Sequence, residues 1–181
     1  MSYATARDAL ADRIRYVPDF PAEGVIFEDL TPVLADGEAL RVIVDELSQA
    51  VKEMGAEMIG GLDARGFLLG SAVAYKLGMG VLAIRKKGKL PPPVFSAEYD
   101  LEYGSAALEI PGSGVELQGR KIALVDDVLA TGGTLCAARS LLEKAGASVV
   151  GNALVLEVGG LGGRQKLADV PLVVLNNGDI A

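Results

Sequence analysis

The segment with the most chemical content is residues 122–134, which reads Ile-Ala-Leu-Val-Asp-Asp-Val-Leu-Ala-Thr-Gly-Gly-Thr. An apolar run, predicted to be a strand, leads into two adjacent carboxylates, Asp126 and Asp127. In an open α/β sheet, ligands bind beyond the carboxyl ends of the strands, and these two side chains would lie there. Because ionised carboxylates only accept hydrogen bonds, the pair suits the hydroxyl groups of a sugar.

The small residues after the acidic pair suit a phosphate group. Thr131 to Thr134 offer backbone N–H groups, two hydroxyls and the positive end of a predicted helix. The Lys and the glycine spacing of a P-loop are absent, which argues against a nucleoside triphosphatase. Helix capping and an ordinary Gly-Gly turn would explain parts of the segment without a ligand. The whole pattern nevertheless favours a phosphorylated sugar.

Several kinds of chemistry are excluded by composition. The chain has 181 residues, no histidine and one cysteine, Cys136. These counts exclude Ser-His-Asp and Cys-His triads, His-ligated zinc, a site of several thiolates and an intrachain disulfide. Any chemistry must therefore use carboxylates, Lys, Arg, hydroxyls, backbone groups or a hard metal. We expect Cys136 to be a small buried apolar residue, and the lack of disulfides fits a reducing compartment.

Charge and hydropathy indicate the surroundings of the protein. The 17 Lys and Arg residues face 24 Asp and Glu residues, a net charge of -7, so the surface should repel nucleic acid and anionic membranes. The N-terminus lacks the apolar core of a signal peptide, and no apolar stretch reaches the roughly 20 residues that span a bilayer. We therefore expect a cytoplasmic protein with neither nucleic-acid nor membrane partners.

The elements that must position the acidic pair follow from periodicity. The length predicts one domain, residues 1–181. An amphipathic helix is expected over 38–54, and a short surface helix over 2–16. After residue 57, strands and helices alternate, which predicts an open, mostly parallel α/β sheet flanked by helices. The expected strands are 58–62, 81–84, 121–125, 148–156 and 172–175, and the helices between them end near 77, 145 and 167.

Two segments interrupt the alternation and could cover a site. The apolar residues 25–27 are too short to classify as strand or loop and are a candidate lid. Residues 85–104 open with Arg85, Lys86, Lys87, Gly88 and Lys89, pass three prolines and end in aromatic and acidic residues. This length exceeds that of most loops, so we expect either an extended hairpin or a mobile active-site loop.

Residues 126–134 resemble the phosphoribosyl-diphosphate (PRPP) binding motif of the type I phosphoribosyltransferases. Other segments resemble the adenine-specific members of that family, and together they cover residues 20 to about 166. These segments are Phe20-Pro21, Gly24-Val25-Ile26-Phe27, Asp63-Ala64-Arg65-Gly66-Phe67, residues 85–91 and Tyr99-Asp100-Leu101-Glu102-Tyr103-Gly104. The resemblance implies the type I phosphoribosyltransferase fold, with a small N-terminal hood of about residues 1–35 and a long flexible catalytic loop of about residues 85–104. It also implies Mg²⁺-dependent transfer of ribose 5-phosphate from PRPP to N9 of adenine, giving AMP and diphosphate, by a homodimer.

The resemblance further implies a role for each site residue. Asp126 and Asp127 would hold the ribose hydroxyls. Glu102 would act as general acid and base on the purine, with Tyr103 in the same closing loop. Adenine would stack between Phe27 and Val128. Backbone groups around Ile26 would read its edge, and the 5-phosphate would lie in the loop of Ala130, Thr131, Gly132, Gly133 and Thr134. The diphosphate would meet Arg65, a third catalytic residue, together with Arg85, Lys86 and Lys89, which could reach it across a dimer interface. Mg²⁺ would be held mainly by the phosphates and hydroxyls of PRPP, with no protein ligand assigned.

General chemistry is compatible with these roles. Displacement at an anomeric carbon passes through an oxocarbenium-like state, so carboxylates can stabilise the sugar while cations stabilise the leaving group. In a chain without histidine, a carboxylate such as Glu102 is a suitable proton carrier. Each role also has a plainer alternative, since Glu102 could be a solvated charge, residues 85–89 a solvated turn and Phe27 a core residue.

Two other functions remain open at this point. The family commonly has an Arg where this chain has Glu28, which loses a cation at the lid and leaves open a phosphoribosyltransferase for hypoxanthine, guanine or xanthine. A regulator that only senses PRPP is a further alternative. Such a protein usually carries a DNA-binding element, for which this acidic chain has no spare residues.

Overall fold

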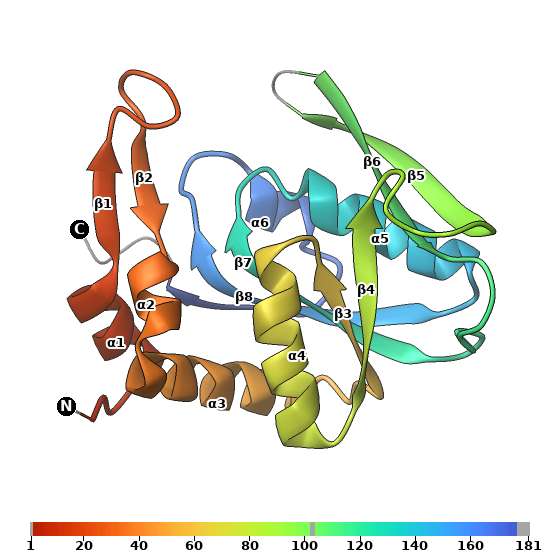
Figure 1. Ribbon diagram of the computed structural model, residues 1–181, viewed down its shortest axis with the longest axis horizontal. Coiled ribbons are helices and arrows are strands. Elements are labelled where there is room, and N and C mark those ends of the chain that lie inside the picture. The colour runs from red at the N-terminus through yellow and green to blue at the C-terminus, as the bar shows by residue number, and fades with distance from the viewer. Residues whose placement is uncertain (1, 102–103, 177–181) are drawn as a thin grey trace.

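The computed structural model describes residues 2–101 and 104–176 (Figure 1). Within them, seven strands form one sheet in the order β5-β6-β4-β3-β7-β8-β9. The five parallel strands are β3 (Met58–Leu62), β4 (Gly80–Lys86), β7 (Lys121–Leu129), β8 (Ser148–Glu157) and β9 (Leu172–Asn176). The antiparallel hairpin of β5 (Val94–Leu101) and β6 (Gly104–Pro111) joins the edge of β4. Figure 1 shows helices on both faces of this sheet.

Alternation along the central strand builds two apolar layers. On β7, Ala123 and Val125 pack with residues of α3 (Gly37–Glu53) and α4 (Arg65–Leu77). Their neighbours Ile122 and Leu124 face the opposite way and pack with residues of α5 (Gly133–Lys144). A strand with both faces covered must be apolar throughout, which explains the run that precedes the acidic pair. A short helix, α6 (Gly163–Lys166), precedes β9.

The N-terminal segment forms a small unit beside the carboxyl ends of the parallel strands (Figure 1). It contains α1 (Ala6–Arg13), the antiparallel strands β1 (Arg15–Pro18) and β2 (Ile26–Asp29), and α2 (Thr31–Ala35). The helix expected over 2–16 is therefore too long. It begins after a capping box of Thr5 and Asp8 and ends at Ile14, whose backbone is extended. The apolar residue Val17 belongs to β1, where it pairs with Phe27.

Other differences from the sequence expectations lie where strands pair with distant segments. Strand β7 continues four residues past the expected end at 125, because β8 supports it as far as Leu129. Residues 94–101 lie within the segment 85–104, which was expected to be an extended hairpin or a mobile loop, and they form a strand that pairs with β6 in a hairpin. Strand β6 was not predicted, and it joins the sheet through Arg85 and Lys86 of β4. In the described part of the chain, no helix is both long and apolar enough to cross a bilayer.

Candidate functional site

The acidic pair projects past the end of a neighbouring strand. The pairing of β7 with β3 ends at Val125 opposite Gly61, and beyond this point β7 pairs with β8 as far as Leu129. Asp126 and Asp127 therefore stand at the carboxyl edge of the sheet, as the sequence predicted. The start of α4 lies close against them, since a Cβ atom at Gly66 would lie 2.7 Å from the carbonyl oxygen of Val125.

The two carboxylates are in different electrostatic states. Asp127 is 6% exposed and forms an ion pair with Nε of Arg65, and its backbone N–H donates to Oδ1 of Asp126 at 2.9 Å. Burial first, and then the negative charge of Asp127, raise the pKa of Asp126 to about 8. At neutral pH Asp126 is thus mostly protonated. The sequence reasoning assumed two ionised carboxylates, whereas burial and the charge of Asp127 favour the protonated form of Asp126, an effect that the charge of Arg65 partly offsets.

The loop after β7 has the features of an anion-binding site. Gly132 precedes α5 with a φ of 77°, a left-handed conformation that glycine adopts without strain. No side chain caps the helix, and the hydroxyl of Thr131 accepts a 3.4 Å hydrogen bond from the N–H of Gly133. Residues 130–134 therefore bring backbone N–H groups and hydroxyls together where a helix begins, which is the geometry expected for a phosphate site.

Gly163, which the sequence reasoning missed, supports this loop from behind. A Cβ atom at Gly163 would lie 2.2 Å from the carbonyl oxygen of Ala130, and one at Gly132 would lie 3.1 Å from the carbonyl oxygen of Gly163. The two backbones thus touch at glycines. The sequence Gly162-Gly163 before a short helix does not reveal this contact, because the contact joins segments that are distant along the chain.

An apolar pocket of about 240 Å³ lies between the N-terminal unit and the ends of β7 and β8. Its lining includes three predicted residues, Ile26, Phe27 and Val128. The ring of Phe27 meets that of Phe20 edge to face, with centroids 5.2 Å apart. Glu28 also lines the pocket, and burial raises its pKa. The remaining lining residues are Val25, Leu156, Glu157, Val158 and Gly159.

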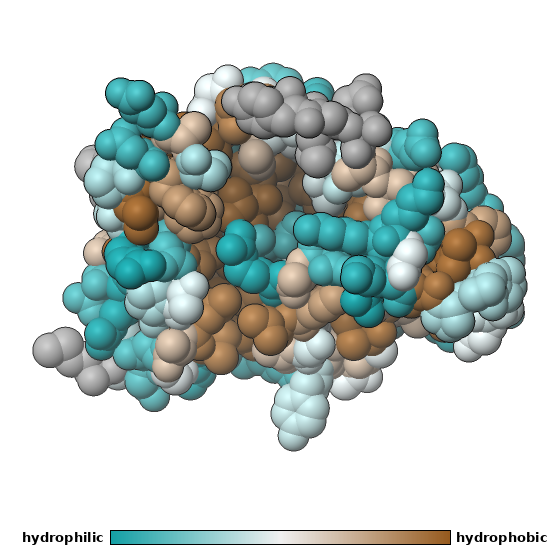
Figure 2. All heavy atoms as spheres, turned by 45° about the horizontal axis from the view of Figure 1, so that its top comes forward, coloured by the Kyte–Doolittle hydropathy of each residue, from teal (hydrophilic) through white to brown (hydrophobic). Residues whose placement is uncertain are grey.

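The residues at the end of β8 were missed, although a sequence rule could have found them. They follow the strand next to β7, so they lie at the same carboxyl edge of the parallel sheet. Glu157 is held there by Arg164 of α6, whose Nε lies 3.0 Å from Oε2. Figure 2 looks onto a hollow in the molecule, with apolar side chains at its depth and polar ones around its rim.

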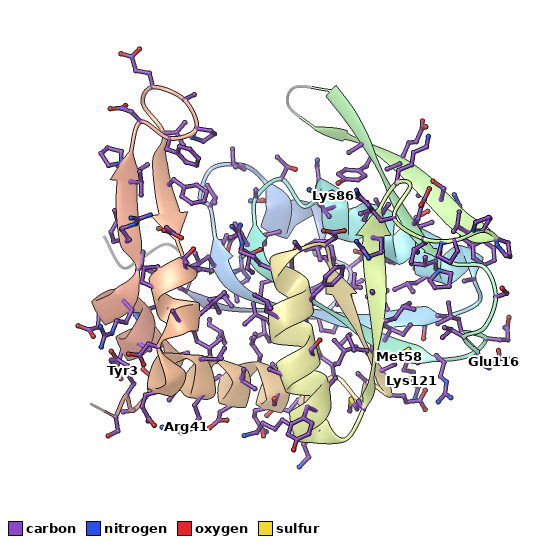
Figure 3. All side chains as sticks on the ribbon, viewed as in Figure 1. Tyr3, Arg41, Met58, Lys86, Glu116 and Lys121 are labelled. Carbon is purple, nitrogen blue, oxygen red and sulfur yellow. The ribbon has the colours of Figure 1, made fainter. Side chains whose placement is uncertain are left out.

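The basic segment is anchored to the loop before α4. Nε of Arg85 donates to Oδ2 of Asp63 at 3.0 Å, and its guanidinium lies 5.4 Å from the centre of the Phe67 ring. Burial alone would raise the pKa of Asp63, but hydrogen bonds from Arg85 and the Lys86 N–H lower it. Lys86 and Lys89 are exposed. Figure 3 shows Lys86 at the upper end of β4.

Two of the predicted catalytic residues, Glu102 and Tyr103, lie outside the described residues. They belong to the connection between β5 and β6. Within the described ranges, no group of three or more His, Cys, Asp or Glu side chains could hold a metal ion.

Comparisons with known proteins match this arrangement. The phosphoribosyl transferase domain family matches residues 34–172. The adenine phosphoribosyltransferase of Corynebacterium diphtheriae is 69% identical over 174 residues, which are 96% of this chain and 95% of that protein. The crystal structure of adenine phosphoribosyltransferase from Thermoanaerobacter pseudethanolicus superposes with a TM-score of 0.89 and 41% identity, over 95% of this chain and 99% of that chain.

A third relative was solved with ligands. The Saccharomyces cerevisiae adenine phosphoribosyltransferase, complexed with D-2,5-dideoxy-2,5-imino-altritol 1,6-bisphosphate and adenine, has a TM-score of 0.85 and 37% identity, over 94% of this chain and 97% of that chain. Fold and site together define a phosphoribosyltransferase. Within this class, the chain belongs to the adenine phosphoribosyltransferase family. The fold class, the family and the enzyme class predicted from the sequence are confirmed.

Proposed function

We propose that this protein transfers the ribose 5-phosphate unit of PRPP to N9 of adenine. The bond between C1′ and the diphosphate oxygen breaks, and diphosphate leaves with the electron pair. The bond between N9 and C1′ forms, and the N9 proton passes to a base. The observation that carries this proposal is that three different subsites gather at the end of β7. Val128 lines the apolar pocket, which suits a base, the acidic pair at 126–127 suits a ribose, and the loop of residues 130–134 before α5 suits a phosphate.

The acidic pair is suited to the ribose. Asp127 accepts hydrogen bonds, and Asp126 can donate while it is protonated and accept once it has ionised. A carboxylate below the ring also stabilises positive charge that develops on C1′. We therefore assign the ribose hydroxyls to Asp126 and Asp127, and the 5-phosphate to Ala130, Thr131, Gly132, Gly133 and Thr134.

The leaving group requires cations. Arg65, Arg85, Lys86 and Lys89 supply them from the start of α4 and the end of β4. When bound with PRPP, Mg²⁺ would add positive charge at the diphosphate, held mainly by the phosphates and beside the carboxylates of residues 126 and 127. To bind a substrate phosphate, Arg65 must then release Asp127 or contact the phosphate and Asp127 together.

The base would stack in the pocket between Phe27 and Val128. Ile26 lies at its opening, where backbone groups can reach the polar edge of adenine. We assign the proton transfer to Glu102, with Tyr103 next to it in the sequence, because no histidine is available. This assignment rests on the family resemblance.

We also propose that the enzyme is a homodimer. Helix α4 exposes Leu68 by 62% and Tyr75 by 90%, and residues seven apart lie on one face of a helix. Val81, at the start of β4, is exposed as well. Large apolar side chains grouped in this way are typical of an interface, and a second copy of the chain would cover them. The same copy could bring basic residues of β4 near its partner's cleft.

The reaction can be tested by offering four bases separately. Diphosphate release from PRPP and Mg²⁺ is measured with adenine, hypoxanthine, guanine and xanthine. We expect release with adenine only, with AMP as the product, which would also show that Glu28 is compatible with adenine binding. Release with a 6-oxopurine instead would assign the enzyme to another base. Binding of PRPP without any release would favour a sensor of PRPP.

A further inference from the structure

Glu109 is an acidic residue near the middle of β6, and it is 6% exposed. Its neighbours across the sheet are Arg85 on β4 and Ser96 on β5. Burying a carboxylate is costly unless hydrogen bonds compensate for the lost water. The carboxylate of Glu109 accepts such a bond at Oε2 from the backbone N–H of Gly88, at 2.9 Å. None of the roles proposed above uses this side chain.

Gly88 belongs to the basic turn, which we define as residues 85–89. Three hydrogen-bond acceptors from other segments fix the backbone of this turn and the side chain of Arg85, its first residue. Asp63 binds the side chain of Arg85 and the N–H of Lys86, the carbonyl of Ala107 accepts from the N–H of Lys87 at 3.0 Å, and Glu109 accepts from Gly88. Gly88 has a φ of 76°, so the chain reverses there in a left-handed conformation. Glu109 is thus the anchor at the far end of the turn.

The consequence for function concerns two lysines. Lys86 and Lys89 lie on either side of Lys87 and Gly88, and both expose their side chains. Cations that are already oriented toward a leaving group stabilise it better than cations that must first be ordered. Without an acceptor for its N–H, Gly88 would lose its link to β6, and binding a polyanion would carry the added entropy cost of ordering the turn.

We propose that Glu109 is a positioning residue for the leaving diphosphate, because it fixes Gly88 and thereby the placement of Lys86 and Lys89. This inference rests on the proposed function, in which those lysines meet the diphosphate. A carboxylate that served only the stability of the sheet would affect every ligand alike. A positioning residue should affect the diphosphate and leave the ribose 5-phosphate subsite unchanged.

The test uses the full-length enzyme and isothermal calorimetry with two probes, magnesium diphosphate and AMP. Removing one charge-assisted hydrogen bond corresponds to about a tenfold change in affinity. We therefore expect Glu109→Ala to weaken diphosphate binding about tenfold and to raise the KM for PRPP similarly. AMP affinity and the KM for adenine should change less than about twofold. Glu109→Gln keeps an acceptor oxygen in place and should recover most of the loss.

Glu116 offers a matched control. Its carboxylate also accepts a backbone N–H, from Gln118 at 3.1 Å, but it is exposed and Figure 3 places it far from Lys86. Glu116→Ala should leave both affinities unchanged. Hydrogen exchange at the Gly88 amide gives a readout without ligand, and exchange should be faster in Glu109→Ala than in the wild type.

The outcomes separate this inference from the function on which it rests. Lys86→Ala should weaken diphosphate binding. If it does not, the assignment of the basic turn to the diphosphate is wrong. If Lys86→Ala weakens binding while Glu109→Ala changes neither diphosphate affinity nor Gly88 exchange, the positioning role is refuted. Equal losses for AMP and diphosphate in both Glu109 variants would also refute it, because they would indicate a general structural role.

Discussion

The guanidinium of Arg65 forms an ion pair with the carboxylate of Asp127, across the junction between the start of α4 and the end of β7. The cation assigned to the leaving diphosphate and an anion assigned to the ribose thus neutralise each other. A sugar diphosphate placed between them would offer hydroxyls to Asp127 and phosphates to Arg65. Arg65 would then bind a phosphate in place of Asp127, and Asp127 would bind a hydroxyl in place of Arg65. Before the substrate arrives, the ion pair holds both side chains in the positions that binding requires.

The stability of the protein should fall as the pH rises through neutrality. Asp126 has a pKa of about 8, raised mainly by burial, whereas an unfolded Asp titrates near 3.9. Between these pH values the folded state holds a proton that the unfolded state has lost. The contribution of this proton to the free energy of unfolding is therefore complete below about pH 4 and lost by about pH 8.

Asp126→Asn isolates this contribution. The variant should show a shallower fall of Tm between pH 5 and pH 8.5 than the wild type, measured by differential scanning calorimetry. It should also bind PRPP more weakly, because an amide cannot become the charged acceptor that the ribose site requires. Identical pH slopes for the two proteins would contradict the raised pKa, and unchanged PRPP affinity would contradict the placement of Asp126 at the ribose.

Phe27→Leu should weaken adenine binding by about tenfold. Stacking of a base on an aromatic ring contributes about 1–3 kcal/mol, and a leucine keeps the apolar contact without the flat ring. The KM for PRPP should change little, since Phe27 lines the apolar pocket assigned to the base. Phe20→Leu is the control, because Phe20 meets Phe27 edge to face and does not line that pocket. Comparable losses in both variants would point to a defect of the whole N-terminal unit.

Gly163→Ala should act on the 5-phosphate. The new Cβ would lie 2.2 Å from the carbonyl oxygen of Ala130, so the loop of residues 130–134 must shift. We expect AMP affinity to fall about tenfold or more, while far-UV circular dichroism stays the same. Gly37→Ala is a suitable control, since a Cβ there meets nothing within 4 Å. Normal AMP affinity in Gly163→Ala would mean that this contact does not shape the phosphate site.

The dimer proposal predicts a mass near twice the 18.7 kDa of the chain in sedimentation velocity. Leu68→Glu places a charge on the exposed face of α4 and should shift the protein toward monomer. Lys52→Glu, on the exposed side of α3, adds a carboxylate elsewhere on the surface and should not. A wild-type protein that sediments as a monomer at micromolar concentration would exclude a stable dimer.

Local pattern was sufficient for the part of the site that one segment builds. The buried strand, the acidic pair and the glycine turn of residues 122–134 are contiguous, and their order alone indicates a sugar next to a phosphate. The amphipathic α3 was equally clear from its apolar face, which is a local feature, although its N-cap at Asp36 was not predicted. Such elements carry their structural signal in their own residues.

Features that depend on distant partners could not be predicted in this way. The charge state of Asp126 follows from burial under α4 and from Asp127, whose cation comes from 62 residues away. The strands β1, β2, β5 and β6 are short or carry charges, and they form because each has a partner across a turn. Gly163 and Glu109 act through single contacts with loops remote in sequence. No spacing rule connects such pairs.

The role of Glu102 remains a prediction, because this residue lies outside the described part of the chain. If its side chain moves the proton during formation of the N9–C1′ bond, Glu102→Gln should lower kcat by roughly 10² to 10⁴ while PRPP affinity stays nearly unchanged. Glu98→Gln provides the control, since Glu98 lies on the same hairpin with its side chain 77% exposed. Single-turnover kinetics ensures that chemistry, and not product release, is measured. A normal single-turnover rate in Glu102→Gln would remove this residue from proton transfer, and the carboxylates that line the base pocket, Glu28 and Glu157, would be tested next.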